Sequence, residues 1–140
     1  MTGPVDPMPF GVRRTEGFSH KRSPLSVKET VDRLSEGVRA AGATIFVVID
    51  HSGEAERVGL SLRDTKLVVF GNPMGGTPAM VYSPLAAIDL PLRVLVWNDD
   101  GGTVWMSYLT PKWIADRHEL PTGLEAPLFA VEKLTDQVAA

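Results

Sequence analysis

The chain of 140 residues contains no cysteine, which excludes disulfides and thiolate chemistry. It has no run of about 18–20 apolar residues of the kind a membrane span needs, so we expect no membrane partner. It also has no basic excess: the formal net charge is −3. A protein that neutralises many phosphates usually carries a strong basic excess, so we expect no nucleic-acid partner. With no signal-peptide pattern at its start, the chain is predicted to be cytoplasmic.

The amino-acid composition is that of an ordinary globular protein, with 44% hydrophobic and 22% charged residues. The length fits one domain. Three prolines fall within the first nine residues, so we expect a flexible lead-in over 1–9 and a single domain over 10–140.

Hydrophobic periodicity places the helices and strands. Ser26 and Glu29 form a capping box before apolar residues at helical spacing, which predicts a helix over 27–41. Thr44–Asp50 is β-branched and apolar, as expected of an interior strand. Further predicted strands cover most of 11–24 and all of 67–70, 92–97 and 103–109, with a Gly-rich hairpin turn between the last two.

Shorter helices are predicted at 52–58, 77–82, 84–88 and 111–118, and a second long amphipathic helix within 122–140. One sheet with both long helices on one face buries every apolar stripe. The predicted fold is therefore α+β: a two-layer sandwich whose mostly antiparallel sheet has about five strands.

Several segments also resemble the DUF302 family over about residues 10–120. They are Phe70–Pro73, Gly76–Thr77, Asp89–Trp97, Val104–Trp105 and Ser107–Tyr108, with Ile49–His51, Gly59 and Arg117–His118 as further matches. The resemblance implies a TATA-box-binding-protein-like fold in β-α-β4-α order and frequent homodimers. It implies no activity, and a fold name alone carries no nucleic-acid role.

The first candidate site is the segment from Gly71 to Thr77. Its glycine spacing is similar to that of a phosphate-binding loop, but Thr77 stands where that motif requires lysine. We expect Gly71, Asn72, Gly75, Gly76 and Thr77 to bind a small anionic ligand through free main-chain N–H groups. The alternative is a tight turn in which Asn72 bonds local backbone.

The second candidate site is Asp50–His51, at the end of the predicted strand 44–50. His51 can act as a general acid or base tuned by Asp50, or the pair can simply cap the next helix. The weakest candidate is a metal site formed by the three histidines with nearby carboxylates; their spacing does not favour it, and we expect no metal or cofactor.

Two other features carry less weight. Trp97, Trp105 and Trp113 are predicted to lie in the core, at an interface or around a ligand. Asp89 is expected either to cap a turn or to pair with Arg93, and it needs a partner if it is buried.

The leading hypothesis is a non-catalytic small-molecule or anion-binding domain that forms a homodimer. The alternatives are an enzyme that uses His51 beside the Gly71–Thr77 segment, and an interaction domain without a ligand.

Overall fold

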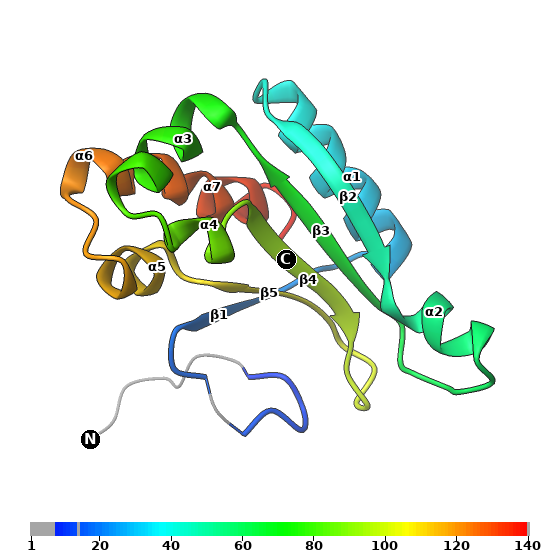
Figure 1. Ribbon diagram of the computed structural model, residues 1–140. Coiled ribbons are helices and arrows are strands. Elements are labelled where there is room, and N and C mark those ends of the chain that lie inside the picture. Colours follow the sequence, from blue (N-terminus) through cyan, green and yellow to red (C-terminus); the bar gives the residue numbers. More distant parts are fainter. Residues whose placement is uncertain (1–7, 14, 140) are drawn as a thin grey trace, which may run out of the picture.

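A computed structural model describes residues 8–13 and 15–139 (Figure 1). Most of the predicted lead-in over 1–9 lies outside the described residues. The elements follow in the order β1 (Phe18–Arg22), α1 (Val27–Ala40), β2 (Thr44–Asp50), α2 (His51–Arg57), β3 (Thr65–Gly71), α3 (Pro73–Tyr82), α4 (Ala86–Asp89), β4 (Leu92–Asn98), β5 (Val104–Leu109), α5 (Pro111–Arg117), α6 (Thr122–Glu125), a 3₁₀ turn η1 (Ala126–Phe129) and α7 (Ala130–Asp136).

The five strands form one antiparallel sheet in the order β1-β5-β4-β3-β2. Because side chains alternate along a strand, every second residue faces α1 and α7. That face is fully buried at its centre, where Val68 lies opposite Val94 and Val96 lies opposite Met106. The predicted α+β sandwich is confirmed.

Two sequence signals produced the expected local structure. The Glu29 amide donates to the Ser26 Oγ at 3.1 Å, and the Ser26 hydroxyl donates to Glu29 Oε1 at 3.0 Å, so the capping box starts α1. In the β4–β5 hairpin Gly102 has a φ of +87°, and its amide donates to the Asp99 carbonyl at 3.0 Å. Both are contacts between residues close in sequence.

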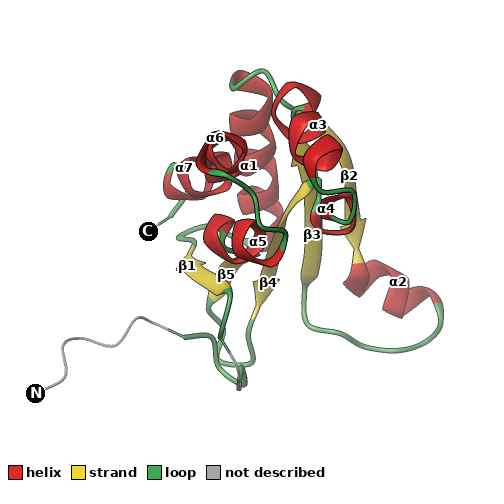
Figure 2. Cartoon of the chain, turned by 60° about the vertical axis from the view of Figure 1, so that its left-hand side comes forward, coloured by secondary structure: helices red, strands yellow, loops and turns green. Residues whose placement is uncertain are grey.

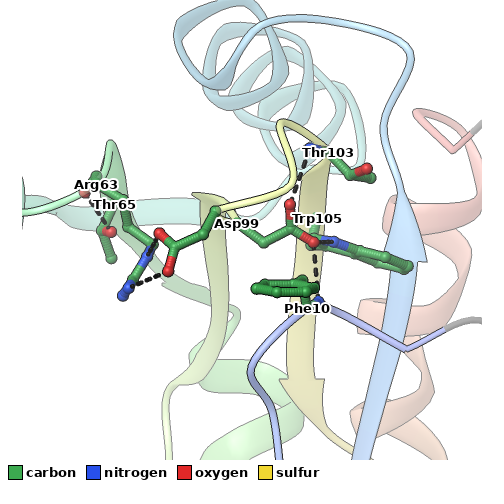
Figure 3. Close-up of polar contacts among 7 residues, drawn as sticks. Phe10, Arg63, Thr65, Asp99, Thr103 and Trp105 are labelled. Atoms are coloured by element: carbon green, nitrogen blue, oxygen red, sulfur yellow. Dashed lines mark hydrogen bonds and ion pairs between the residues drawn. The ribbon is translucent and has the colours of Figure 1, made fainter.

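The hairpin residue Asp99 anchors the first described segment of the chain (Figure 3). Its buried carboxylate accepts from the Phe10 amide at 2.9 Å, the Thr103 amide at 3.0 Å and the Trp105 indole at 2.8 Å. Burial by itself raises the pKa of Asp99, but these donors more than offset it and hold the pKa below its ordinary value.

Three predicted elements have different bounds in the structure. The first strand is only β1, because Gly11 and Gly17 turn the chain with positive φ. The last helix is divided into α6, η1 and α7, with Pro127 inside η1. The segment from Pro73 to Thr77, predicted as a loop, is the first part of α3, since Asn72 caps the helix and Pro73 occupies its first position.

The sheet has two ends that differ in what surrounds them (Figure 2). One end, which we call the pocket end, carries Thr44, Gly71 and Leu92. The helices α3 and α6 and the last turns of α1 lie around it. The hairpin end carries Asp50 and the β4–β5 turn, and α2 projects from it with no buried residue. Both sequence-predicted sites lie at these ends, one at each.

Candidate functional site

At the pocket end, Asn72 pairs the first amides of α3. Its side-chain oxygen accepts from the Met74 amide at 3.0 Å. Its carbonyl accepts from the amides of Gly75 and Gly76 at 2.9 and 3.0 Å, and Pro73 has no amide proton to offer. The amides of Met74, Gly75 and Gly76, among the main-chain donors that the anion hypothesis invokes, are therefore paired within the chain.

The same residues nevertheless line a cavity of about 520 Å³. Gly71, Asn72, Gly75, Gly76 and Thr77 form one wall, so all five predicted ligand-binding residues lie around one space. The opposite walls come from the end of α1, from the Leu90–Leu92 segment before β4, and from η1 and α7. The five residues singled out from the sequence therefore lie in one pocket wall, where the amides of Gly75 and Gly76 are paired with the Asn72 carbonyl.

Small residues keep this space open. Gly37, Ala40, Ala41 and Ala43 line it from α1 and the turn that follows. In α3, a Cβ added at Gly75 would lie 2.7 Å from the Cβ of Pro127, so only glycine lets α3 approach η1 this closely. A Cβ added at Gly76 would meet only the Met80 methyl, at 3.8 Å. The two adjacent glycines thus do different things: one permits packing and the other leaves room.

The cavity is mainly apolar, with Phe46, Phe70, Met80, Leu128 and Leu134 among its lining residues. Lys133 of α7 and Gln137, which directly follows that helix, add polar groups. None of the ion pairs in the described chain involves Lys133. An apolar pocket with one available cation suits a hydrophobic molecule with an acidic group.

A second hollow of similar volume lies between α1 and the β2–β3 edge. Asp32, Glu36, Arg39 and Lys66 line it, so charged side chains dominate its surface. It lacks the apolar walls that ligand pockets usually have.

Asp50 and His51 lie at the hairpin end, away from the cavity. Asp50 pairs with Lys66 in the sheet whereas Gly71 pairs with Thr44, which separates the two predicted sites by roughly 17 Å along β3. The expectation that they are neighbours is wrong, because both adjoin β3 but at opposite ends. His51 is exposed and has no side-chain hydrogen bond in the described chain.

Asp50 acts as the cap of α2. Its Oδ1 accepts from the Gly53 amide at 3.0 Å and from the Ser52 hydroxyl at 2.7 Å. These two hydrogen bonds, the first more than the second, lower the pKa of Asp50, with Lys66 at 3.8 Å adding a smaller effect. The capping alternative describes Asp50 correctly, and His51 lines neither of the two hollows.

Asp89 is buried, with 8% of its side chain exposed, and three basic groups surround it. His118 Nε2 lies 2.6 Å from its Oδ2, Arg117 Nε lies 3.6 Å from the same oxygen, and Arg93 Nη2 lies 3.8 Å from Oδ1. The predicted Arg93 partner is confirmed. Sequence reasoning missed the other two, although Arg117–His118 was among the segments that carried the family resemblance.

A second polar cluster, also missed from the sequence, joins β1, β5 and β4. Ser107 Oγ accepts from the Trp97 indole at 2.9 Å and lies 2.7 Å from His20 Nδ1. Burial lowers the pKa of His20, whose Nε2 has no partner in the described chain. Ser107 is itself buried, so this arrangement gives no accessible nucleophile.

The three tryptophans have separate roles, and none of them lines the cavity. Trp105 is 2% exposed and lies in the interior, while the Trp97 indole donates to Ser107 in the cluster just described. Trp113 is 36% exposed and packs on Gly17, where an added Cβ would lie 2.5 Å from its ring. Within the described residues, no group of three His, Asp or Glu side chains is placed to hold a metal ion.

The fold and its cavity define the class: an α+β sandwich with a pocket at one end of its sheet. The chain belongs to the DUF302 family, because the family model described as "Domain of unknown function DUF302" matches residues 19–138.

A solved structure supports the fold. The crystal structure of an uncharacterized conserved DUF302 protein from Bacillus stearothermophilus superposes with a TM-score of 0.73 and 16% identity, covering 88% of this chain and 95% of that one.

Sequence comparison finds similarity to proteins named as fluoride channels. "Fluoride-specific ion channel FluC 1" of Brucella suis biovar 1 is 40% identical over 106 residues, which cover 76% of this chain and 42% of that protein. FluC 1 of Brucella abortus biovar 1 is also 40% identical, with 39% of its length covered. The chain thus spans about two fifths of the length of these curated relatives. No helix among the described residues has both the length and the apolar character to cross a membrane.

Proposed function

We propose that this domain binds a small, mainly apolar molecule carrying one acidic group in the cavity at the pocket end, without catalysing a reaction. The observation that carries the proposal is the cavity itself. Its volume of about 520 Å³ falls within the roughly 300–1,000 Å³ typical of small-molecule sites. The five residues singled out from the sequence form one of its walls.

The chemistry of the walls supports this ligand class over a simple inorganic anion. The first amides of α3 are paired with Asn72, so they offer nothing to a sulfate or phosphate. Lys133 supplies a positive charge beside apolar surface. A hydrocarbon chain or ring therefore gains from burial, and a carboxylate gains from Lys133.

Thermal unfolding with three probes tests the proposal. Decanoate offers both a chain and a carboxylate, decanol offers the chain alone, and sulfate offers the charge alone. A ligand that binds only the native state stabilises it by about 2.7 kcal/mol at 100 times its dissociation constant. We expect decanoate to raise the melting temperature most and decanol less. Any shift that sulfate causes is expected to arise outside the cavity and therefore to persist when the cavity is filled.

A matched set of variants locates the effect. Gly76→Leu places a side chain in the cavity, where the backbone leaves room for it, and is expected to abolish the decanoate shift. Gly76→Ala and the distant His51→Ala serve as controls that keep the shift. Lys133→Met is expected to reduce decanoate to the level of decanol. A decanoate shift that survives in folded Gly76→Leu protein contradicts the proposal.

The homodimer is part of the same proposal. The sheet face turned away from α1 and α7 carries apolar side chains on both edge strands, where Phe18 of β1 is 48% and Val47 of β2 is 45% exposed, with partly buried Val69 and Leu95 between them. A two-fold interface can use the same surface on both copies. Light scattering after size exclusion is expected to give twice the chain mass for the wild type and the monomer mass for Val47→Asp.

A further inference from the structure

A basic cluster at the pocket end lies outside the cavity and has no role in the proposal above. Arg93 on β4 and Arg117 on α5 both turn toward the buried carboxylate of Asp89, which also accepts from His118. These residues are distant in sequence and meet only in the fold. We propose that Arg93 and Arg117 form a binding site for a phosphate group, with Asp89 holding the two guanidinium groups in place.

The two arginines retain most of their hydrogen-bonding capacity. Their distances to Asp89, 3.8 Å for Arg93 and 3.6 Å for Arg117, exceed the 2.7–3.2 Å typical of N–H···O bonds. Neither guanidinium makes a hydrogen bond within the described chain. Their side chains are 40% and 58% exposed, so the unused donors are open to solvent.

The charge of the cluster matches an oxyanion. Two guanidinium groups against one carboxylate leave one uncompensated positive charge. The ion pairs of the described chain bring no other carboxylate to either arginine. A phosphate dianion has enough acceptor oxygens to receive two planar forks from different directions. A single carboxylate lies in one plane and suits one fork.

The site is also pre-organised. Asp89 is the last residue of α4 and is 6% exposed, so its position is fixed by packing. Its contact with His118 is the shortest in the cluster and ties α4 to the end of α5. The charge of a carboxylate fixed in this way attracts both guanidinium groups and offsets part of the repulsion between them before an anion binds.

Titration with inorganic phosphate at constant ionic strength tests this inference, with the arginine Nε–Hε resonances as the readout. We expect saturable shifts of Arg93 and Arg117, and no shift of Arg63, which pairs with Asp100 at the other end of the sheet. Arg93→Gln and Arg117→Gln are each expected to weaken phosphate binding about tenfold, as the loss of a charge-assisted hydrogen bond does. Arg63→Gln is the matched control.

Three outcomes overturn the inference: unsaturable shifts of all arginines alike, unchanged affinity in the folded Arg93→Gln/Arg117→Gln protein, or acetate binding as tightly as phosphate. Gly76→Leu separates this site from the cavity. It is expected to lose the decanoate effect and to bind phosphate as the wild type does, so each site can fail on its own.

Discussion

The two ends of the sheet use the same local device and have different surroundings. A polar side chain caps a helix at each end: Asn72 caps α3, and Asp50 caps α2. At the pocket end other helices close around the cap and leave a cavity between them. At the hairpin end α2 buries no residue and stands in solvent. In this chain, the glycine-rich segment and the Asp50–His51 pair, each at the end of a strand, both mark the cap of a helix. Whether a binding cavity forms there depends on which elements pack over the cap.

The largest expected difference between the ends concerns their ion pairs. Asp89→Asn removes a buried carboxylate and weakens its hydrogen bond with His118, while the two arginines still reach solvent, so we expect a cost of roughly 1.5–3 kcal/mol of unfolding free energy. Asp100→Asn removes a pair that is exposed on both sides, and we expect almost no loss. Urea denaturation of the two variants measures both values. Equal losses would contradict the view that the Asp89 cluster is buried and the Arg63–Asp100 pair is exposed.

Local rules account for much of the fold. The capping box at Ser26, the periodic apolar positions of α1 and the hairpin turn are all settled within a few residues, and each was predicted correctly. The register of β4 against β5 follows from the short hairpin that joins them. These are the features for which neighbouring residues supply the whole interaction.

The site was predictable only in part, because its other members come from far along the chain. Gly71 to Thr77 could be singled out, but Pro127, Leu134 and Lys133 approach them only after the C-terminal segment folds back. His118 reaches Asp89 across 29 positions. The amides of Gly75 and Gly76 were expected to be free because their helix was predicted to start at Thr77.

The two glycines of α3 offer the next test. Gly75→Ala brings a methyl group within 2.7 Å of the Pro127 ring, and the strain is expected to cost about 1–3 kcal/mol. Gly76→Ala has free space and removes glycine from a helix, so a gain of roughly 0.5–1 kcal/mol is expected. Thermal or urea unfolding compares them directly. A stable Gly75→Ala protein would show that α3 and η1 do not pack closely.

Replacing each capping residue, Asn72 or Asp50, by alanine compares how much the capping hydrogen bonds stabilise the two ends of the sheet. Asn72→Ala is expected to lower the unfolding free energy by about 1 kcal/mol, because α3 packs on other elements and its loss is felt globally. Asp50→Ala is expected to increase hydrogen exchange within α2 and to leave global unfolding unchanged, since α2 buries nothing. Faster exchange throughout the sheet in Asp50→Ala would contradict this division.

The smallest expected difference between the two capping side chains is their response to acid, because Asp50 carries an ionisable carboxyl group and Asn72 does not. The hydrogen bonds from Gly53 and Ser52 hold the pKa of Asp50 below its ordinary value of 3.8. A carboxyl group with a lowered pKa in the folded state stabilises that state above its unfolded pKa, and the contribution is lost as pH falls through the folded value. We therefore expect the Gly53 amide resonance to shift and its exchange to accelerate as pH falls below about 3.8, while the Met74 amide, bonded to the Asn72 amide group, stays unchanged.

Asp50→Asn gives α2 a cap of the same kind as that of α3, so it should remove the pH dependence at Gly53. A Gly53 transition that persists in Asp50→Asn would assign the acid response to another carboxylate, of which Asp99 at the same end of the sheet is the first to examine.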